Sequence, residues 1–312
     1  MAHAFHAGER AVQARAGEAA IALRNAGVIT DTVIAGARAF IEKQPMVATA
    51  TRNAEGQLWA SLLFGPPGFA RSPEGRAIEI HVGAERRAAD DPFWQGLAAG
   101  SHAGLLFIEP STRRRYRVNG HVERLDGGVL RLGIAEAYPN CPKYIQRRHP
   151  RADAAALAAE PASASTTRRG QALDDTAMAL LTAADTLFIA SGAPDGELDA
   201  SHRGGPPGFI QLLDARRLRV PDYAGNSMFN TLGNLALDPA CGLLVPDFEN
   251  GRLLHLSGRA SLHWDQPDPQ GLTGGTQRFW EFELSDWLLR PAASGLSWEF
   301  LDASPFLPTT RP

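Results

Sequence analysis

Two short stretches in the second half of this 312-residue chain hold residues suited to binding an anion. The first is Ser201-His202-Arg203-Gly204, at the end of a predicted strand. The second is GNSMFN, residues 225–230, at the start of a predicted helix. An arginine forms charge-assisted hydrogen bonds with phosphate. The first N–H groups of a helix are free and carry a partial positive charge. Together the two stretches predict a phosphate site, with Arg203 as the cation and Asn226 and Ser227 as neutral donors.

The second half of the chain repeats the first. ASLLFGPPGF (60–69) recurs as ASHRGGPPGF (200–209), and later blocks keep the register. The segment 78–80 matches 218–220, and at a slightly shorter offset Gly104 matches Gly242 and Gly120 matches Gly258. An internal repeat of this kind indicates two copies of one structural unit.

The two copies differ where the anion would bind. Copy one has Leu62-Leu63-Phe64 in place of His202-Arg203-Gly204. At the start of the corresponding helix it has Asp90, Asp91 and Pro92. The carboxylates repel an anion, and proline has no N–H to donate. We therefore expect one site per chain, in copy two, with copy one as its structural partner.

The elements that must position these residues follow from periodicity. Two helices are expected in residues 1–45, over Glu9–Ala26 and Asp31–Phe40. From Met46 the apolar period changes to two, which predicts strands. Six strands and one short helix in each copy favour a small antiparallel barrel, since a closed sheet has no free edge. The expected units are 1–45 N-terminal helices, 46–135 barrel copy one, 136–183 helical connector with a helix starting at Pro142, 184–290 barrel copy two, and 291–312 C-terminal arm.

Basic residues outside copy two allow two interpretations. In the predicted strand after Arg113, Arg115 and Arg117 share one face and Arg114 has the other. That face either reaches the copy-two site across the pseudo-twofold interface, or belongs to a solvated edge strand protected by charge. Lys143, in a Pro-bounded turn, is either a ligand contact or a solvated charge.

Composition excludes several classes of function. The formal net charge of −3 gives no pull toward nucleic acid or a membrane. No run approaches the ~20 apolar residues of a membrane span, and the polar N-terminus has no signal-peptide core. The two cysteines are far apart and the histidines have no metal-ligand spacing, so we expect a cytoplasmic protein without a metal.

Three blocks carry a family resemblance: DASHRGGPPGF (199–209), PDYAGNSMFNTLGNL (221–235) and YPNCPKYIQ (138–146). With the duplicated barrel they resemble the pyridoxamine 5′-phosphate oxidase-related, flavin-nucleotide-binding split β-barrels. The resemblance implies a mainly β fold with flanking helices, in which two tandem six-stranded antiparallel split β-barrels form a pseudo-dimer. It also implies FMN bound between the barrels. The expected cofactor contacts are Ser201, His202, Arg203, Gly204, Pro221, Asp222, Tyr223, Asn226, Ser227, Met228, Asn230, Arg115 and Lys143.

The function that the resemblance implies is an FMN-dependent oxidoreductase acting on a small molecule, with an electron donor such as NAD(P)H. The pseudo-dimer could pair again as a homodimer. The arginine and histidine that hold substrate in the family's oxidases have no clear match in the C-terminal SPFLPTTRP (304–312), which argues against that particular activity. Tyr223 and His202 are the candidates for proton transfer. The alternatives are a non-catalytic flavin-binding or sensor protein, and a haem-binding split barrel with a histidine ligand.

Overall fold

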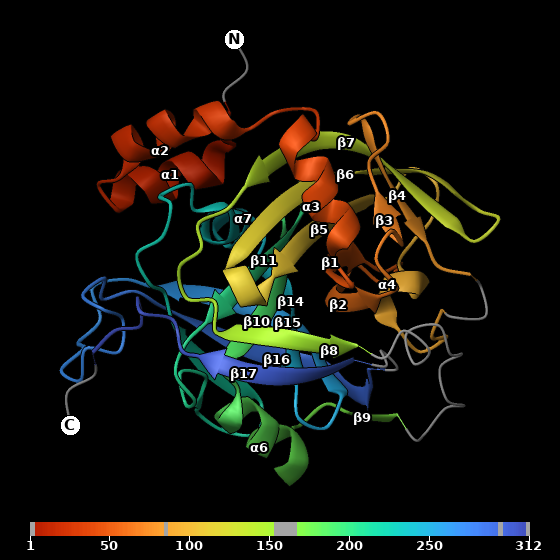
Figure 1. Ribbon diagram of the computed structural model, residues 1–312. Coiled ribbons are helices and arrows are strands. Elements are labelled where there is room, and N and C mark those ends of the chain that lie inside the picture. Colours follow the sequence, from red (N-terminus) through yellow and green to blue (C-terminus); the bar gives the residue numbers. More distant parts are fainter. Residues whose placement is uncertain (1–3, 84–86, 153–166, 293–295, 310–312) are drawn as a thin grey trace.

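A computed structural model describes residues 4–83, 87–152, 167–292 and 296–309, and within these ranges the chain is mainly β. One sheet belongs to copy one, with strand order β2-β1-β5-β6-β7-β4-β3, and another to copy two, with order β11-β10-β14-β15-β16-β13-β12. Each position in one order has its counterpart in the other. The sequence repeat is therefore a repeat of topology, and the two halves lie against each other in Figure 1.

Each copy has the six expected strands and an extra strand of two residues. Copy one consists of β1 (Met46–Arg52), β2 (Leu58–Phe64), β3 (Ala70–Arg71), β4 (Ala77–His81), β5 (His102–Glu109), β6 (Arg114–Asp126) and β7 (Val129–Pro139). Copy two consists of β10 (Thr186–Gly192), β11 (Leu198–Gly204), β12 (Gln211–Leu212), β13 (Arg217–Pro221), β14 (Ala240–Asp247), β15 (Arg252–His263) and β16 (Phe279–Pro291), with β9 (Arg168–Gly170) added beside β16.

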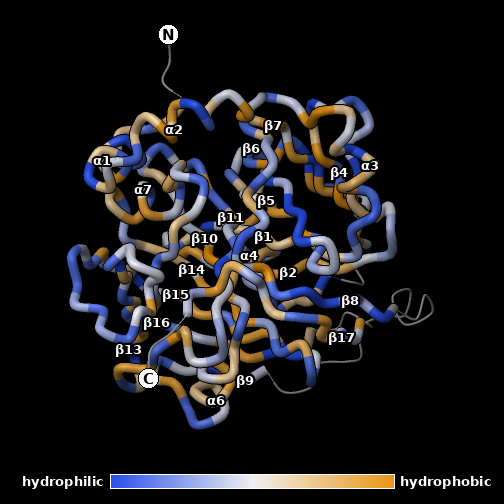
Figure 2. The backbone as a smooth tube through the Cα atoms, turned by 60° about the vertical axis from the view of Figure 1, so that its left-hand side comes forward, coloured by the Kyte–Doolittle hydropathy of each residue, from blue (hydrophilic) through white to orange (hydrophobic). Residues whose placement is uncertain are grey.

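Each copy has its own hydrophobic core, and a third cluster joins them. This cluster combines apolar residues of β1, β2 and β5 with those of β10, β11, β14 and β15, and apolar stretches run through the middle of the molecule in Figure 2. The matched glycines lie here. A Cβ on Gly104 would stand 2.7 Å from the backbone nitrogen of Ala200, and one on Gly242 would stand 2.5 Å from the backbone oxygen of Leu58. The backbones of the two halves therefore touch at two pseudo-symmetric points.

The N-terminal segment is helical, but its helices are not the expected ones. The continuous helix Glu9–Ala26 is instead α1 (Ala7–Arg15), α2 (Ala19–Asn25) and a 3-10 turn, η1 (Ala26–Val28). The break falls at Gly17, whose φ of 70° is left-handed and ends α1. The next helix, α3 (Ala35–Lys43), has Ile34 as its N-cap rather than the expected Asp31. No helix of the described residues is both long and apolar enough to cross a membrane.

The connector contradicts the prediction of a helix at Pro142. Residues 140–146 form no helix, and β8 (Arg147–Ala152) is a strand that pairs with β17 (Leu296–Asp302) of the C-terminal arm. The partner strand lies about 150 residues away, so local propensity could not reveal the pairing. The loose helix or surface loop expected over residues 152–164 lies, from residue 153 on, outside the described residues. The later part of the connector is helical as predicted, at α6 (Asp175–Ala183).

Two short helices correspond between the copies. Copy one has α4 (Pro92–Gln95) and copy two has α7 (Asn230–Leu237), each placed between the third and fourth long strands of its copy. The N-terminal helix α1 packs beside α7.

Candidate functional site

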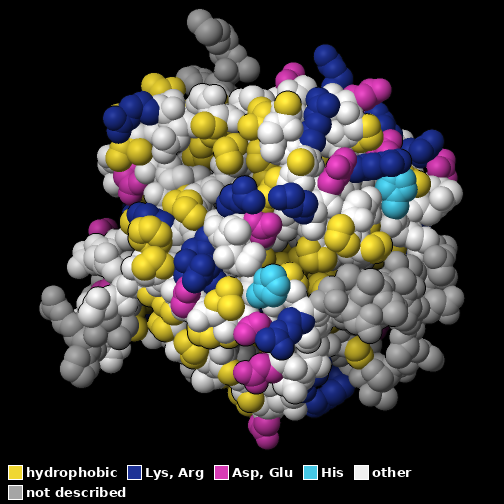
Figure 3. Space-filling view, in the orientation of Figure 1, with side chains coloured by type: hydrophobic (Ala, Val, Ile, Leu, Met, Phe, Trp, Pro, Cys, Tyr) yellow, Lys and Arg dark blue, Asp and Glu magenta, His cyan; other side chains and the backbone are white. Residues whose placement is uncertain are grey.

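A cavity lies where β6 and the 140–144 segment of copy one meet β11, β13 and the start of α7 in copy two. All the residues expected to hold a cofactor line it, except Met228. Figure 3 shows Lys and Arg side chains gathered across the middle of the molecule. The lining residues that the sequence analysis did not name as contacts are Arg117, Asn140, Cys141, Tyr144, Phe209, Gly225, Phe229, Thr231 and Leu232.

Arg117 joins the two copies at the inner wall of the cavity. Its guanidinium donates to Ser201 of β11, and its Nη1 lies 2.9 Å from the carboxylate of Asp199 and 2.9 Å from the Tyr138 hydroxyl. The Thr231 hydroxyl of α7 also donates to Ser201, at 3.1 Å. This group is buried, so each polar atom depends on its partners. The interpretation of a solvated edge strand is wrong for Arg117.

Arg115, two residues earlier on the same face of β6, has a different environment. Its Nε donates to the Cys141 carbonyl at 2.7 Å and its Nη1 to the His202 carbonyl at 3.3 Å. No carboxylate of the described residues pairs with it. Burial, with added repulsion from Arg117 and Arg203, lowers the pKa of Arg115 to about 10. The guanidinium still carries its charge at neutral pH, and that charge has no counter-ion within the described chain.

Arg203 extends from the end of β11 toward a second arginine that the sequence analysis missed. Its Nη1 is 3.2 Å from Asp222, and Asp222 also accepts from Arg278 at 3.0 Å. Arg278 lies just before β16, and its guanidinium stacks over the Phe229 ring at 5.1 Å. Nothing local in the sequence marks Arg278, because only the folded chain brings it beside Asp222. One carboxylate thus serves two arginines at this end of the cavity.

The 225–230 loop enters α7 through two residues in the left-handed region. Ser227 has a φ of 65° and Phe229 a φ of 59°, uncommon values for non-glycine residues that persist only where surrounding contacts fix them. Phe229 caps α7 without a side-chain hydrogen bond. Among the described residues, no group accepts a hydrogen bond from the backbone N–H of Asn230, Thr231 or Leu232. The helix start therefore keeps free donors at the cavity wall.

The N-terminal helices hold this loop in place, a role that the sequence analysis did not foresee. Four hydrogen bonds join the N-terminal segment to the loop: Ser227 Oγ to Glu18 at 2.5 Å, Gln13 to the Met228 carbonyl at 2.9 Å, Asn25 to the Asn226 carbonyl at 2.7 Å, and Asn230 to Glu9 at 2.5 Å. A fifth joins His6 with Asn234 of α7 at 2.8 Å. Met228 itself packs with Phe5, Ala22 and Tyr138, away from the cavity. Its expected place among the cofactor contacts is corrected to a packing role.

The 140–144 segment crosses the cavity beside β11. A Cβ on Gly204 would lie 1.9 Å from the Tyr144 carbonyl oxygen, so only glycine allows this crossing. The Tyr144 ring lies 4.8 Å from the Tyr223 ring, and its hydroxyl donates to the Ala224 carbonyl. Lys143 also lines the cavity, with its ammonium 5.7 Å from the Phe306 ring of the C-terminal arm.

The pKa values of the two candidates for proton transfer, His202 and Tyr223, are both shifted away from neutral pH. His202 is buried, and burial together with the charges of Arg115 and Arg203 holds the pKa of its ring well below the usual range. Burial raises the pKa of the Tyr223 hydroxyl, with a smaller effect from Tyr144. At neutral pH the imidazole is therefore uncharged and the phenol is protonated. Neither group is poised near pH 7, the condition that favours general acid-base catalysis.

The matching position in copy one is filled by side chains. Asp91 accepts from the Phe93 N–H at 3.0 Å, from Ser61 at 2.6 Å and from Arg290, and Arg290 also donates to His255 at 3.1 Å. Asp91, Arg290 and His255 are buried. The Asp91 carboxylate, a group of the protein itself, thus accepts the helix-start N–H of Phe93 in α4.

Comparison with known proteins gives the following matches. A family model described as pyridoxamine 5′-phosphate oxidase matches residues 35–167 and 173–282, one segment for each copy. No curated protein matches the chain. A putative pyridoxamine 5′-phosphate oxidase from Lactobacillus delbrueckii is 14% identical, with a TM-score of 0.31, over 38% of this chain and 94% of that one. HupZ from Group A Streptococcus is 10% identical, with a TM-score of 0.29, over 36% and 90%. HutZ, a heme storage protein from Vibrio cholerae, is 15% identical, with a TM-score of 0.25, over 36% and 89%.

Proposed function

The chain belongs to the pyridoxamine 5′-phosphate oxidase family, and on this premise we propose that it binds FMN in the cavity between its copies and acts as an oxidoreductase on a small molecule. The substrate and the electron donor, for which NAD(P)H is the first candidate, would approach through the open side of that cavity.

The observation that carries the proposal is the uncompensated charge of Arg115. A partly buried guanidinium that donates only to carbonyl oxygens keeps its charge without a counter-ion, and an anion or an electron-rich group would complete its environment. Other polar atoms of the same cavity wall are also buried without a partner among the described residues: Arg117 Nε, Arg203 Nε, His202 Nδ1 and Asn140 Oδ1. Donors predominate in this set, and FMN offers phosphate, carbonyl and ring-nitrogen acceptors. The cavity wall therefore fits the group.

The residues divide into two parts by chemistry. The free N–H groups at the start of α7, with Asn226, Ser227 and Arg203, suit the phosphate. Arg115, Arg117, Ser201 and His202 suit the ring end, where cationic donors favour added electron density. When bound, FMN supplies hydride and one-electron chemistry, and the protein supplies placement and charge. Ser227 now donates to Glu18, so phosphate binding requires that hydrogen bond to be exchanged.

The test begins with the absorption spectrum of purified protein and titration with FMN. We expect flavin bands, and we expect Arg115→Leu to weaken both FMN and riboflavin binding by about tenfold or more, since charge-assisted contacts are worth roughly 1.5–3 kcal/mol. Arg114→Leu is the matched control, because Arg114 is the adjacent exposed residue on the opposite face of β6. Absence of FMN binding, or equal effects of the two substitutions, would contradict the proposal.

Catalysis is separated from simple binding by a second measurement. NAD(P)H added without oxygen should bleach the flavin bands of the wild-type protein. Bound FMN that no nicotinamide donor bleaches would instead support a flavin-binding or sensor protein.

One observation favours a second candidate ligand. His202 faces the cavity with Nδ1 unpartnered, and a neutral imidazole is the form that ligates iron. A Soret band in the purified protein, lost in His202→Ala, would identify haem in place of FMN.

A further inference from the structure

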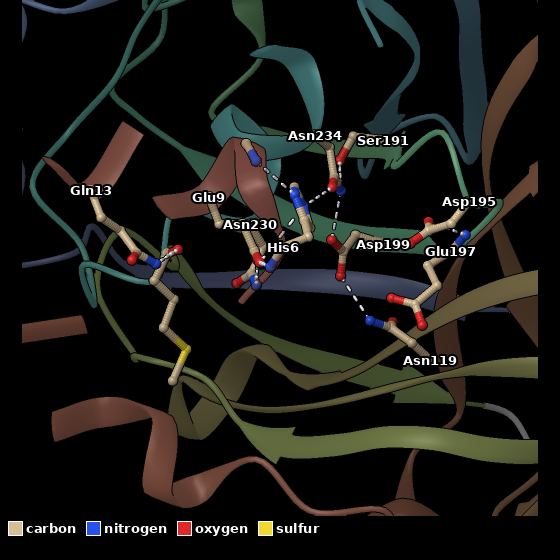
Figure 4. Close-up of polar contacts among 12 residues, drawn as sticks. His6, Glu9, Gln13, Asn119, Ser191, Asp195, Glu197, Asp199, Asn230 and Asn234 are labelled. Atoms are coloured by element: carbon tan, nitrogen blue, oxygen red, sulfur yellow. Dashed lines mark hydrogen bonds and ion pairs between the residues drawn. The ribbon is translucent and has the colours of Figure 1, made fainter. Parts of the chain in front are cut away.

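A second cavity lies behind the first, on the far side of Asn230. It occupies about 240 Å³, well above the ~15 Å³ that one water molecule requires. Its walls come from α1, β6, β7, the β10–β11 hairpin and α7. Figure 4 shows polar side chains from the N-terminal segment, β6, the β10–β11 hairpin and α7 converging around Asp199. The lining includes five carboxylates that share this space: Glu9, Glu136, Asp195, Glu197 and Asp199.

The side chains that line this cavity present more hydrogen-bond acceptors without a partner than donors without one. Among the described residues, no hydrogen bond or ion pair reaches the carboxylate of Glu136 or that of Glu197. Asn119, only 6% exposed, donates its amide to Asp199 at 2.8 Å, but its Oδ1 has no partner. A buried amide oxygen without a donor normally indicates a missing ligand or water.

The hydrogen-bond donors already present in the lining are bonded to acceptors other than Glu136 and Glu197. Asn234 donates to Ser191 at 3.0 Å and to Asp199 at 2.7 Å, Asn230 donates to Glu9, and Arg117 is paired with Asp199. The group that would complete the cavity therefore brings N–H donors and positive charge. A metal ion is not favoured, because no three metal-ligating side chains of the described residues converge on one point.

We propose that this cavity binds a small organic cation with a protonated amine, held by Glu136, Glu197 and the Asn119 carbonyl. A primary ammonium has three donors and no acceptor, which matches the unfilled oxygens. The volume accommodates an alkyl diamine rather than a single ion. The site is separate from the FMN cavity and does not depend on the proposed function.

The titration of the cavity supports a cation. Burial, and then Asp199, raises the pKa of Glu9 to about 8, and burial with Asp199 and Glu197 raises that of Glu136 to about 7. A bound cation favours the ionised carboxylates, so binding should release protons and strengthen as the pH rises from 6 to 8. Besides the five carboxylates, the charged or titratable groups facing this space are His6 just before α1, Arg117 of β6 and His102 of β5.

The test is calorimetric titration of the full chain with 1,4-diaminobutane at pH 8 and low salt. Butane-1,4-diol and succinate serve as neutral and anionic probes of similar length. We expect only the diamine to bind, with proton release visible as a heat that depends on the buffer. Glu136→Gln should weaken binding about tenfold, as expected for loss of a charged hydrogen-bond partner.

Two further variants keep the test decisive. Glu197→Gln, at the exposed mouth, should also weaken binding and does not threaten folding. Glu55→Gln, an exposed residue of the β1–β2 turn, should leave the affinity unchanged. The proposal is overturned if the diamine does not bind to the wild-type chain, or if its affinity is unchanged in both Glu136→Gln and Glu197→Gln.

Discussion

Arg117 of copy one forms an ion pair with Asp199 of copy two, with 2.9 Å between Nη1 and Oδ1. Both side chains are buried, and the same arginine donates to Ser201. Asp199 also accepts from Asn119 on the copy-one side and from Asn234 of α7. The polar centre of the molecule is thus shared between the copies, and neither copy alone completes it.

Replacing Arg117 should cost more stability than replacing an exposed arginine of the same strand. Arg117→Met leaves Asp199 buried without its cation, and we expect a loss of about 3–5 kcal/mol in the free energy of unfolding. Arg124→Met, which removes a surface pair with Asp126, should cost less than about 1 kcal/mol. Urea denaturation measures both. Adding Asp199→Asn to Arg117→Met should restore part of the loss, and equal costs for the two single variants would refute the assignment.

Arg203 should distinguish FMN from riboflavin. It lines the same cavity as the proposed phosphate contacts Asn226 and Ser227, so Arg203→Ala is expected to weaken FMN by about tenfold or more and riboflavin by much less. Fluorescence titration with both ligands gives the ratio. A similar loss for the two flavins would show that Arg203 does not meet the phosphate.

Glu9 should make the folded state less stable as the pH rises. The folded chain keeps a proton on Glu9 up to about pH 8, whereas the unfolded chain releases it near 4.5. The folded state therefore binds more protons between these values, and stability falls with rising pH by on the order of 1.4 kcal/mol per pH unit. Glu9→Gln should flatten this slope in urea denaturation at pH 5.5 and 7.5. Glu55→Gln should keep the wild-type slope, and an unchanged slope in Glu9→Gln would contradict the burial of an ionisable Glu9.

Gly204 should not tolerate a side chain. Gly204→Ala places a Cβ against the Tyr144 carbonyl and forces the 140–144 segment away from β11, at a cost of about 1–3 kcal/mol or more. Gly225→Ala is the control, since a Cβ there meets open space and the backbone is not left-handed. Thermal unfolding compares the two, and similar melting temperatures would show that the crossing is looser than described.

One FMN per chain is expected. The copy-two cavity has free donors, and the matching position in copy one is filled by Asp91 and Arg290. Release of the flavin by denaturation, with absorbance compared to protein concentration, gives the ratio. A ratio of two would mean that the Asp91–Arg290 pair opens to admit a ligand.

Much of this arrangement could be predicted from sequence because repetition made local patterns reliable. The repeat aligned the strands, and the contrast between Leu63 and Arg203 pointed to the cavity in copy two. The alternation of side chains along a strand also placed Arg115 and Arg117 on one face, which the structure confirms. That these residues hold FMN stays a prediction.

The remainder depended on contacts between distant segments. Glu9, Gln13, Glu18 and Asn25 lie on helices that read as ordinary amphipathic segments, and nothing local indicates that they hold residues 225–230. The same holds for β8, whose partner is in the C-terminal arm. Arg278 was missed because only the folded chain brings it beside Asp222.

The filled position at Asp91 has a consequence for how such a protein can change. In an assembly of two identical subunits, any substitution is present in both, so a plug that closes one cofactor position closes the other as well. A single polypeptide that encodes both halves escapes this constraint. One half is free to become a rigid support, and only the other half must keep the residues that bind the cofactor.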